Sequence, residues 1–430
     1  MLETLVAFSI VIALCLMGLP LAFVTLLVGT VGVAMMRGLD ASIIMASQQV
    51  MDMFMKESLA VIPIFILMGN LIFRAGIAKE LYDAGYATLG RYRGGLAMST
   101  ILSCAGFSAV CGSSLATSAT MSKVAMPSMR QYRYSDSLST GAIAAGGTLG
   151  IMIPPSVPLI IYGVIAEQDI GLLFMAGILP GALLVLLYII VAAGWTRLSP
   201  SSGPAAAPSS IMEALRATML VWPVVVLFLV ILGGIYGGIF TPTEAASVGA
   251  GGALLFALLR GRIRSLRDML ECLIDSVITT AMILAVAAGA MVFANYLNML
   301  GSPYELVAAV NSLNLGPMEI VMLIAAICIV LGMVFESIGI LFLVIPVFLP
   351  TLLASNIDMI WFGIVVIIVI ELGLITPPIG MNVFTVKATL PDVPLGTIFK
   401  GVTPFIFANL VALILVFMVP EIATFIPSLR

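Results

Sequence analysis

The run GTLGIMIPPSVPLIIYG at residues 147–163 contains a Pro-Pro pair inside an otherwise apolar segment. A shorter run, LGLITPP at residues 372–378, repeats its central pattern of Leu-Gly followed by Pro-Pro. Proline lacks a backbone N–H and clashes with the preceding turn, so each pair breaks a helix and frees carbonyls about one turn upstream. One such break is weak evidence of function, whereas two at matching places indicate an internal repeat.

The two halves of the chain match at further positions. Adding 223 to a residue number carries Pro154 to Pro377 and Asp169 to Asp392. Nearly the same offset relates Pro20 to Pro242 and, after a small shift, Gly106 to Gly332. Similarity between two halves is typical of transporters built from structural repeats.

These matches predict the organisation of the chain. The first repeat is expected at 1–198 with a helix broken at 154–155, and the second at 211–430 with a helix broken at 377–378. Residues 199–210, SPSSGPAAAPSS, are a flexible polar linker between them.

The composition indicates that the solvent around this chain is lipid. Of its 430 residues 62% are hydrophobic and only 9% are charged, whereas a soluble domain carries about 25% charged residues. The net charge of −3 is too small to indicate a nucleic-acid partner. The absence of histidine removes the commonest zinc ligand and the commonest proton shuttle near neutral pH. We therefore predict an all-α polytopic membrane protein.

A helix that crosses a bilayer needs about 20 mostly apolar residues. Such runs, two of them short, lie near 4–17, 20–36, 51–73, 138–165, 170–194, 218–238, 242–259, 276–300, 358–376 and 402–427. Cationic residues cluster after the third, fifth and seventh runs, and the positive-inside rule places those loops in the cytoplasm. Each half then has five spans, and this odd number inverts the second half relative to the first. Both termini are expected outside.

Residues 94–129 do not fit a simple span. Basic residues flank the segment on both sides, and its middle is the Gly/Ser-rich run GFSAVCGSS at 106–114. A segment that begins and ends on one side is best interpreted as a re-entrant hairpin, whose non-helical tip must be covered by protein or water. The alternative is a span whose small residues serve helix packing.

Residues 317–353 show the same character in the second half. Pro317 begins the segment, residues 332–339 interrupt it near a pair of glycines, and Pro346 and Pro350 lie near its end. No Lys or Arg occurs between Arg267 and Lys387, so this second hairpin is expected to enter from outside.

Inverted repeats with broken helices favour a carrier that works by alternating access. At this point the chain resembles the large membrane subunit of a TRAP (tripartite ATP-independent periplasmic) transporter over nearly its whole length. The resemblance is carried by Gly69-Asn70, Gly90-Arg91 with GGLA at 94–97, GSSLAT at 112–117, the run at 147–163, AGILPG at 176–181, GIFTPTEA at 238–245 and GLITPPIGMNVF at 373–384. One departure is Cys111, where the family often has serine.

The resemblance implies an inner-membrane protein with a scaffold and a transport domain that moves like an elevator. It also implies two partners: a small four-helix membrane subunit, and a periplasmic binding protein that delivers the substrate. Import would be driven by sodium, and the substrate would be an organic acid of the sialic acid or C4-dicarboxylate type.

Sodium, like other hard cations, prefers oxygen ligands, and we expect one sodium ion at each hairpin and break. Candidates in the first half are Ser108, Ser113, Ser114, Thr117 and carbonyls around Gly150 and Pro154. Candidates in the second half are Gly332, Glu336, Ser337, Gly373 and Thr376. Each hydroxyl has an alternative role, which is a local bond to a helix carbonyl.

Acidic and polar residues near the breaks add candidates for the substrate. Glu336 would lie at membrane depth, where ionisable groups are costly and usually functional, so it is expected to bind an ion or substrate hydroxyls. Ser156 and Asn382 follow the two breaks and are expected to face the substrate. Glu371 is a weaker candidate, and Glu244 and Lys56-Glu57 are expected to be structural.

Other classes of protein fit less well. An intramembrane hydrolase needs an activated nucleophile, and the chain has neither histidine nor a GxGD motif. A channel would not need inverted broken helices. The remaining alternative is a stand-alone carboxylate carrier, coupled to sodium or protons, that needs no binding protein.

Overall fold

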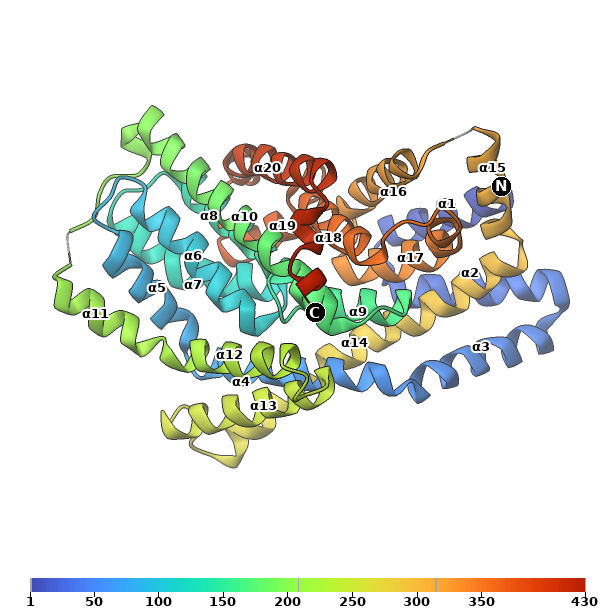
Figure 1. The fold of residues 1–430 in the computed structure, drawn as a ribbon, viewed down its shortest axis with the longest axis horizontal. Coiled ribbons are helices and arrows are strands. Elements are labelled where there is room, and N and C mark those ends of the chain that lie inside the picture. Colours follow the sequence, from blue (N-terminus) through green and yellow to red (C-terminus); the bar gives the residue numbers. More distant parts are fainter. Residues whose placement is uncertain (1, 208, 314, 430) are drawn as a thin grey trace.

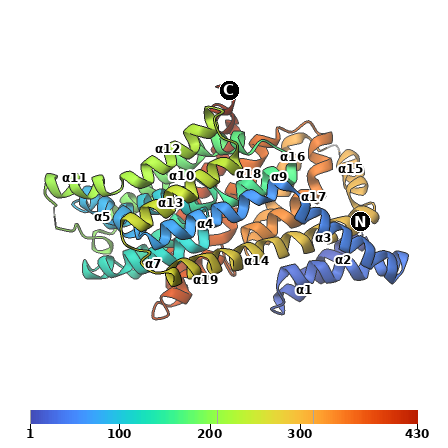
Figure 2. The ribbon, with the colours of Figure 1, turned by 90° about the horizontal axis from the view of Figure 1, so that it is seen from below.

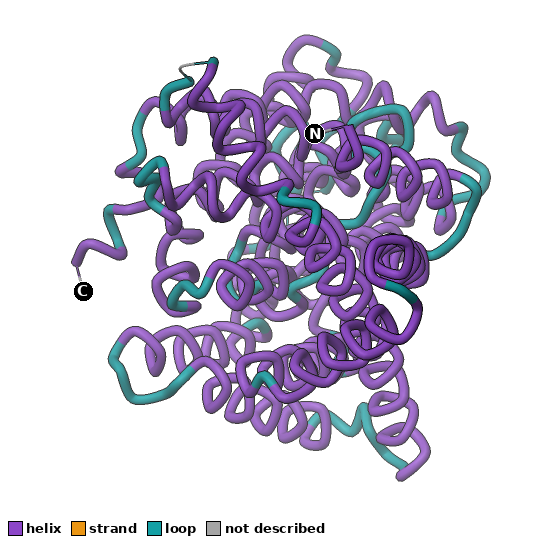
Figure 3. The backbone as a smooth tube through the Cα atoms, turned by 90° about the vertical axis from the view of Figure 1, so that its right-hand side faces the viewer, coloured by secondary structure: helices purple, strands orange, loops and turns teal. Residues whose placement is uncertain are grey.

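The computed structural model describes residues 2–207, 209–313 and 315–429, with backbone alone at 309–311. Within those ranges every regular element is a helix and no strand occurs, as Figure 3 shows. Seven of the described helices, or eight if one bent pair counts as a single span, are long and apolar enough to cross a membrane. The prediction of an all-α polytopic membrane protein is therefore confirmed.

The helices of the first half are α1 (Leu2–Leu16), α2 (Leu21–Arg37), α3 (Leu39–Met55), α4 (Val61–Arg74), α5 (Ile77–Leu89), α6 (Gly95–Cys111), α7 (Ser114–Gln131), α8 (Asp136–Met152), α9 (Val157–Ala166) and α10 (Ile170–Leu198). The second half contains α11 (Ile211–Leu220), α12 (Trp222–Tyr236), α13 (Pro242–Leu259), α14 (Leu266–Met299), α15 (Ser302–Ser312), α16 (Pro317–Gly332), α17 (Ser337–Ala354), α18 (Met359–Ile375), α19 (Met381–Thr389), α20 (Leu395–Met418) and α21 (Glu421–Thr424).

The two halves follow the same path. In each, a helix pair meets at a short tip (α6–α7 and α16–α17), a broken helix follows (α8–α9 and α18–α19), and one long helix ends the unit (α10 and α20). The halves differ before the tips, where α3 and α4 are separated by a short 3-10 turn at Glu57–Ala60 while α14 runs unbroken for 34 residues.

The helices form an outer layer and a central body. Helices α4, α12, α13 and α14 lie along the lower side of Figure 1, and Figure 2, seen from below, brings α4, α13 and α14 to the front. The hairpins and broken helices lie behind them. In the α8–α9 segment 83% of the most apolar window is buried, against 33% in α13, so the broken helices occupy the centre.

The body interlocks the two halves. Each hairpin packs against the broken helix of its own half, α6 and α7 on α8 and α16 on α18. Its second helix also packs against the short helix beyond the break of the other half, α7 on α19 and α17 on α9. The surroundings of each tip therefore contain helices from both halves.

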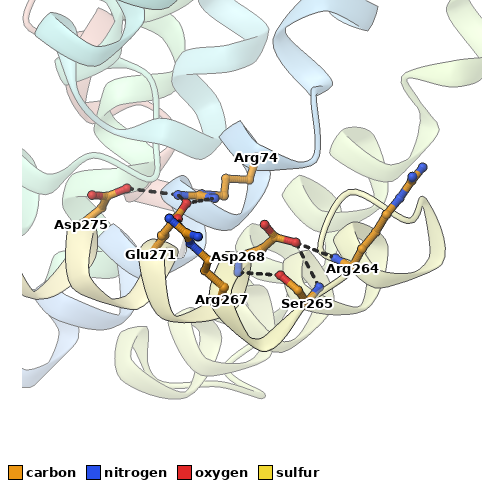
Figure 4. A network of polar contacts seen from close by, with 7 residues as sticks. All are labelled: Arg74, Arg264, Ser265, Arg267, Asp268, Glu271 and Asp275. Carbon is orange, nitrogen blue, oxygen red and sulfur yellow. Dashed lines mark hydrogen bonds and ion pairs between the residues drawn. The ribbon is translucent and has the colours of Figure 1, made fainter.

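Ion pairs and capping hydrogen bonds of charged side chains hold the ends of the outer helices in place. Arg74 at the end of α4 contacts Glu271 at 3.2 Å and Asp275 at 3.5 Å on α14, as Figure 4 shows. In the same view Asp268 accepts backbone N–H bonds from Arg264 and Ser265, each at 3.0 Å, which caps the start of α14. Arg260 pairs with Glu80 and so ties the loop before α14 to α5.

Four helices belong to none of the predicted spans, hairpins or broken helices. Helix α3 fills most of the gap between the second and third predicted spans, and α5, α11 and α15 are short helices that link the larger units. Helix α5 packs on α11 and α6 and also contacts α4, so it connects α4 of the outer layer to the first hairpin.

Candidate functional site

The first tip, residues 112–113, lies directly on the first break, residues 150–156. A side chain on Gly150 would meet the backbone carbonyl carbon and oxygen of Ser113 at 2.8 Å, closer than real contacts allow. Gly112 has a φ of +62°, and a Cβ there would lie 3.2 Å from the carbonyl oxygen of Pro155. Glycine at both positions brings tip and break backbones together, and we name this contact the first junction.

Hydroxyl groups surround the first junction, and two of the four candidates are engaged in local hydrogen bonds. The Ser113 hydroxyl accepts the N–H of Ala116 at 3.4 Å and caps α7, and the Thr117 hydroxyl donates to the Ser113 carbonyl at 2.7 Å. Ser114 is buried. Ser108 is fully buried and its hydroxyl has no partner among the described residues.

Ser118 is a hydroxyl that the sequence did not single out. It is fully buried, and its hydroxyl has no hydrogen-bond partner within the described chain. The side chain packs against Gly147 of α8, where an added Cβ would overlap the hydroxyl. Ser118 directly follows the candidate Thr117, and nothing else in the sequence pattern marked it as a functional residue.

The second junction, between tip residues 332–336 and break residues 373–380, repeats this backbone contact. A Cβ on Gly373 would meet the backbone of Gly332 at 2.6 Å. The N–H of Gly380 donates to the Met333 carbonyl at 3.1 Å, so break and tip are joined by a hydrogen bond. Thr376 donates its hydroxyl to the Leu372 carbonyl at 2.6 Å, and Ser337 is buried beside the tip.

Glu336 faces a cavity rather than the second junction alone. The cavity has a volume of about 300 Å³ and lies between the second tip, the turn joining α1 to α2, and α14. Glu336 is exposed to it, and the other described residues that line it are apolar or cysteine. Within the lining of this cavity, Leu21 of α2 packs against Gly339 of α17.

The two residues expected to face the substrate are both fully buried here. The Ser156 hydroxyl donates to the Ile151 carbonyl at 2.5 Å and also caps α9 by accepting the Leu159 N–H at 3.4 Å. The Asn382 amide donates to the Ala144 carbonyl at 3.2 Å, and its oxygen has no partner among the described groups. Both therefore link segments around the breaks.

The residues expected to be structural differ in their surroundings: Glu244 caps a helix, whereas Lys56 and Glu57 are exposed to a cavity. Glu244 forms a capping box with Thr241 at the start of α13, as a structural role requires. Lys56 and Glu57 lie at the turn between α3 and α4, where both are exposed to a cavity beside α9. No ion pair between them occurs in the described chain.

Comparison with known proteins gives a consistent result. Residues 8–422 match the family described as tripartite ATP-independent periplasmic transporter, DctM component. The chain is 34% identical to the C4-dicarboxylate TRAP transporter large permease protein DctM of Pseudomonas aeruginosa, with 86% of each chain covered. It is 32% identical to the sialic acid TRAP transporter large permease protein SiaM of Vibrio cholerae, with 89% of each covered.

A solved structure supports the fold. The YdaH transporter of Alcanivorax borkumensis superposes with a TM-score of 0.63 at 15% identity, covering 89% of this chain and 88% of that one. At this identity the likeness shows the fold alone.

Proposed function

The chain belongs to the DctM component family of tripartite ATP-independent periplasmic transporters, and on that premise we propose that it imports an organic acid by sodium symport. It is a multi-pass protein of the bacterial inner membrane. Its named relatives are permeases, which supports a carrier rather than an enzyme. They differ in substrate, and we propose a C4-dicarboxylate or sialic acid type of acid.

The observation that carries the sodium proposal is the pair of junctions. At each, glycines allow a hairpin tip to touch the freed backbone of a broken helix, so carbonyl oxygens and nearby hydroxyls lie close together. Hard cations bind such oxygen sets. The proposed ligands are drawn from Ser108, Ser113, Ser114, Thr117, Gly150 and Pro154 at the first junction, and Gly332, Glu336, Ser337, Gly373 and Thr376 at the second.

The proposed substrate site lies between the junctions and the outer layer. Glu336 opens to a cavity there, while Ser156 and Asn382 would gain access only when the body moves. The separation of an outer layer from a central body supports an elevator-like movement of the body. A cavity also lies between α14 of the outer layer and the second tip of the body.

The same premise supports two partners, a small four-helix membrane subunit and a periplasmic binding protein. The test is uptake into liposomes that contain both membrane subunits, with the binding protein and its acid outside. An inward sodium gradient should drive uptake, with a Hill coefficient for sodium above one. Undiminished uptake in sodium-free buffer driven by a proton gradient would refute sodium coupling.

The same liposomes separate the stand-alone carrier from the three-part system. Omitting the binding protein should abolish uptake if the substrate must be delivered. Uptake at an unchanged rate without it would establish the stand-alone carrier instead.

A further inference from the structure

Four polar side chains meet deep in the body, away from both tips. Thr148 lies on α8, Tyr188 on α10, Glu371 on α18 and Asn409 on α20, and none has any exposed surface. Two come from each half, and adding 223 to Thr148 gives Glu371, so these two occupy the same position in the repeat. We name this set the central cluster.

The central cluster points away from the junctions. Thr148 and Glu371 each precede a junction glycine, Gly150 or Gly373, by two residues. Two residues turn an α-helix by about 200°, so the side chains lie on the helix face opposite the tips. Contacts agree, because Thr148 reaches Tyr188 at 3.3 Å while Gly150 faces Ser113.

The cluster has more acceptors than donors to fill them. The Asn409 amide donates to the Tyr188 hydroxyl at 3.2 Å, and the Thr148 hydroxyl donates to the Ala145 carbonyl at 2.8 Å. Glu371 lies beside the Asn409 side chain. Yet both carboxylate oxygens of Glu371 and the amide oxygen of Asn409 accept no hydrogen bond from any described residue.

An ionised carboxylate in this place needs a positive partner. Burying an isolated charge is far more costly than burying a paired one. Glu371 takes part in none of the ion pairs formed within the described ranges. A protonated Glu371 could instead pair with the Asn409 amide through two hydrogen bonds, because that amide has a second N–H besides the one it donates to Tyr188. A bound proton and a bound cation are therefore the two states that the experiment below must separate.

We propose that the central cluster is a third sodium site, with Glu371, Asn409 and Tyr188 as ligands and Thr148 beside them. Two carboxylate oxygens, an amide oxygen and a hydroxyl oxygen form the ligand set that hard cations prefer. One bound ion neutralises the acid and engages all three acceptors that lack a donor. The choice of sodium over another monovalent cation rests on the proposed sodium symport.

The test counts sodium ions bound to the purified two-subunit complex, by equilibrium dialysis with radioactive sodium at constant ionic strength. Glu371→Gln has nearly the same shape but no charge, and should bind one ion fewer per complex than the wild type. Tyr188→Phe keeps the ring packing on Phe405, whose centroid lies 5.5 Å away, and should weaken one class of sites roughly tenfold. The matched control is Glu421→Gln, an exposed acid near the C-terminus, which should bind as the wild type does.

The outcomes separate this site from the junctions. An unchanged ion count in Glu371→Gln overturns the third site, because glutamine mimics a protonated glutamate. If that variant does not assemble, Tyr188→Phe decides by the same measurement, and unchanged affinity overturns the proposal. Failure of the junction sites would appear differently, as unaltered sodium binding in Ser113→Ala and Thr376→Ala while Glu371→Gln still loses an ion.

Discussion

The two hairpin tips share a backbone arrangement but differ in their surroundings. At the first tip α7 buries a row of hydroxyls, and Gly69 of α4 packs against Cys111, where an added Cβ would lie 3.1 Å from its carbonyl oxygen. At the second tip α17 is almost wholly apolar, and Glu336 opens to a cavity of about 300 Å³. One tip is therefore closed against the outer layer, and the other borders a cavity.

The two halves therefore share the backbone contact between tip and break, but differ in the side chains around it. Both junctions rest on glycines that bring two backbones together, Gly150 on Ser113 and Gly332 on Gly373. Carbonyl oxygens can therefore serve both proposed ion sites. We propose that the side chains around the junctions set how tightly each of these sites binds sodium.

The largest effect should follow from filling a junction. Gly150→Val or Gly373→Val would force apart backbones whose contact leaves no room for a Cβ, and overpacking of this kind costs about 1–3 kcal/mol. We expect sodium-driven uptake to be lost in both variants, measured in liposomes. Gly194→Ala is the control, because nothing lies within 4 Å of a Cβ there. Normal uptake in either valine variant would contradict the shared role of the junctions.

The next effect should distinguish the two tips. Glu336→Gln removes a charge that the first tip lacks, so the sodium concentration for half-maximal uptake should rise roughly tenfold. Dependence on membrane voltage should change as well, because each charge moved across 100 mV contributes about 2.3 kcal/mol. The control is Glu421→Gln. Sodium dependence identical to the wild type would remove Glu336 from the ion site.

Loss of single hydroxyls should have a smaller effect. Ser113→Ala at the first junction and Thr376→Ala at the second should each raise the sodium requirement several-fold and lower the Hill coefficient. If the two sites are independent, the free-energy effects in the double variant should add. The measurement is the initial uptake rate over a sodium series. No shift in either variant would assign both hydroxyls to the local bonds they make here.

The smallest effect concerns a pair of equivalent acids outside the junctions. Asp169 caps α10 by accepting the Leu172 N–H at 3.0 Å, whereas Asp392 pairs with Arg130 at the end of α7. The hydrogen bond from Arg130 lowers the pKa of Asp392. Its stabilising contribution is therefore present above the unfolded-state pKa and lost as the pH falls through the folded-state value.

Asp392→Asn should accordingly lower the thermal midpoint slightly at neutral pH, and the two proteins should converge in acid. The effect is small because the pair is exposed. Thermal unfolding of the complex between neutral and acidic pH measures it. A difference that grows as the pH falls would contradict the proposed role of this pair.

The sequence predicted the helical fold because the membrane imposes long apolar runs and the repeat marks the breaks twice. It did not predict α3, α5, α11 and α15. Helix α3 carries Asp40, Gln48 and Asp52 among its apolar residues, and α5 is amphipathic, so neither resembles a span. Their helical state depends on packing against neighbours distant in the sequence.

The junctions could be anticipated from glycine, serine and proline, since each restricts the backbone in a known way. The central cluster could not. Tyr188 and Asn409 are separated by 221 positions and meet only because α10 and α20 pack together. The sequence did single out Glu371 as a weaker candidate, and Asn409 is a lone asparagine in the apolar helix α20, but neither residue indicates its partners.

The measurement that tests the central account most directly is the number of sodium ions moved with each acid molecule. Liposomes containing the two membrane subunits, with binding protein outside, are held at zero voltage while the sodium gradient is varied. At zero net flux the logarithm of the substrate ratio is plotted against the logarithm of the sodium ratio. Two junctions that each carry an ion predict a slope of at least two. A slope of one, or no dependence on sodium, would contradict the account.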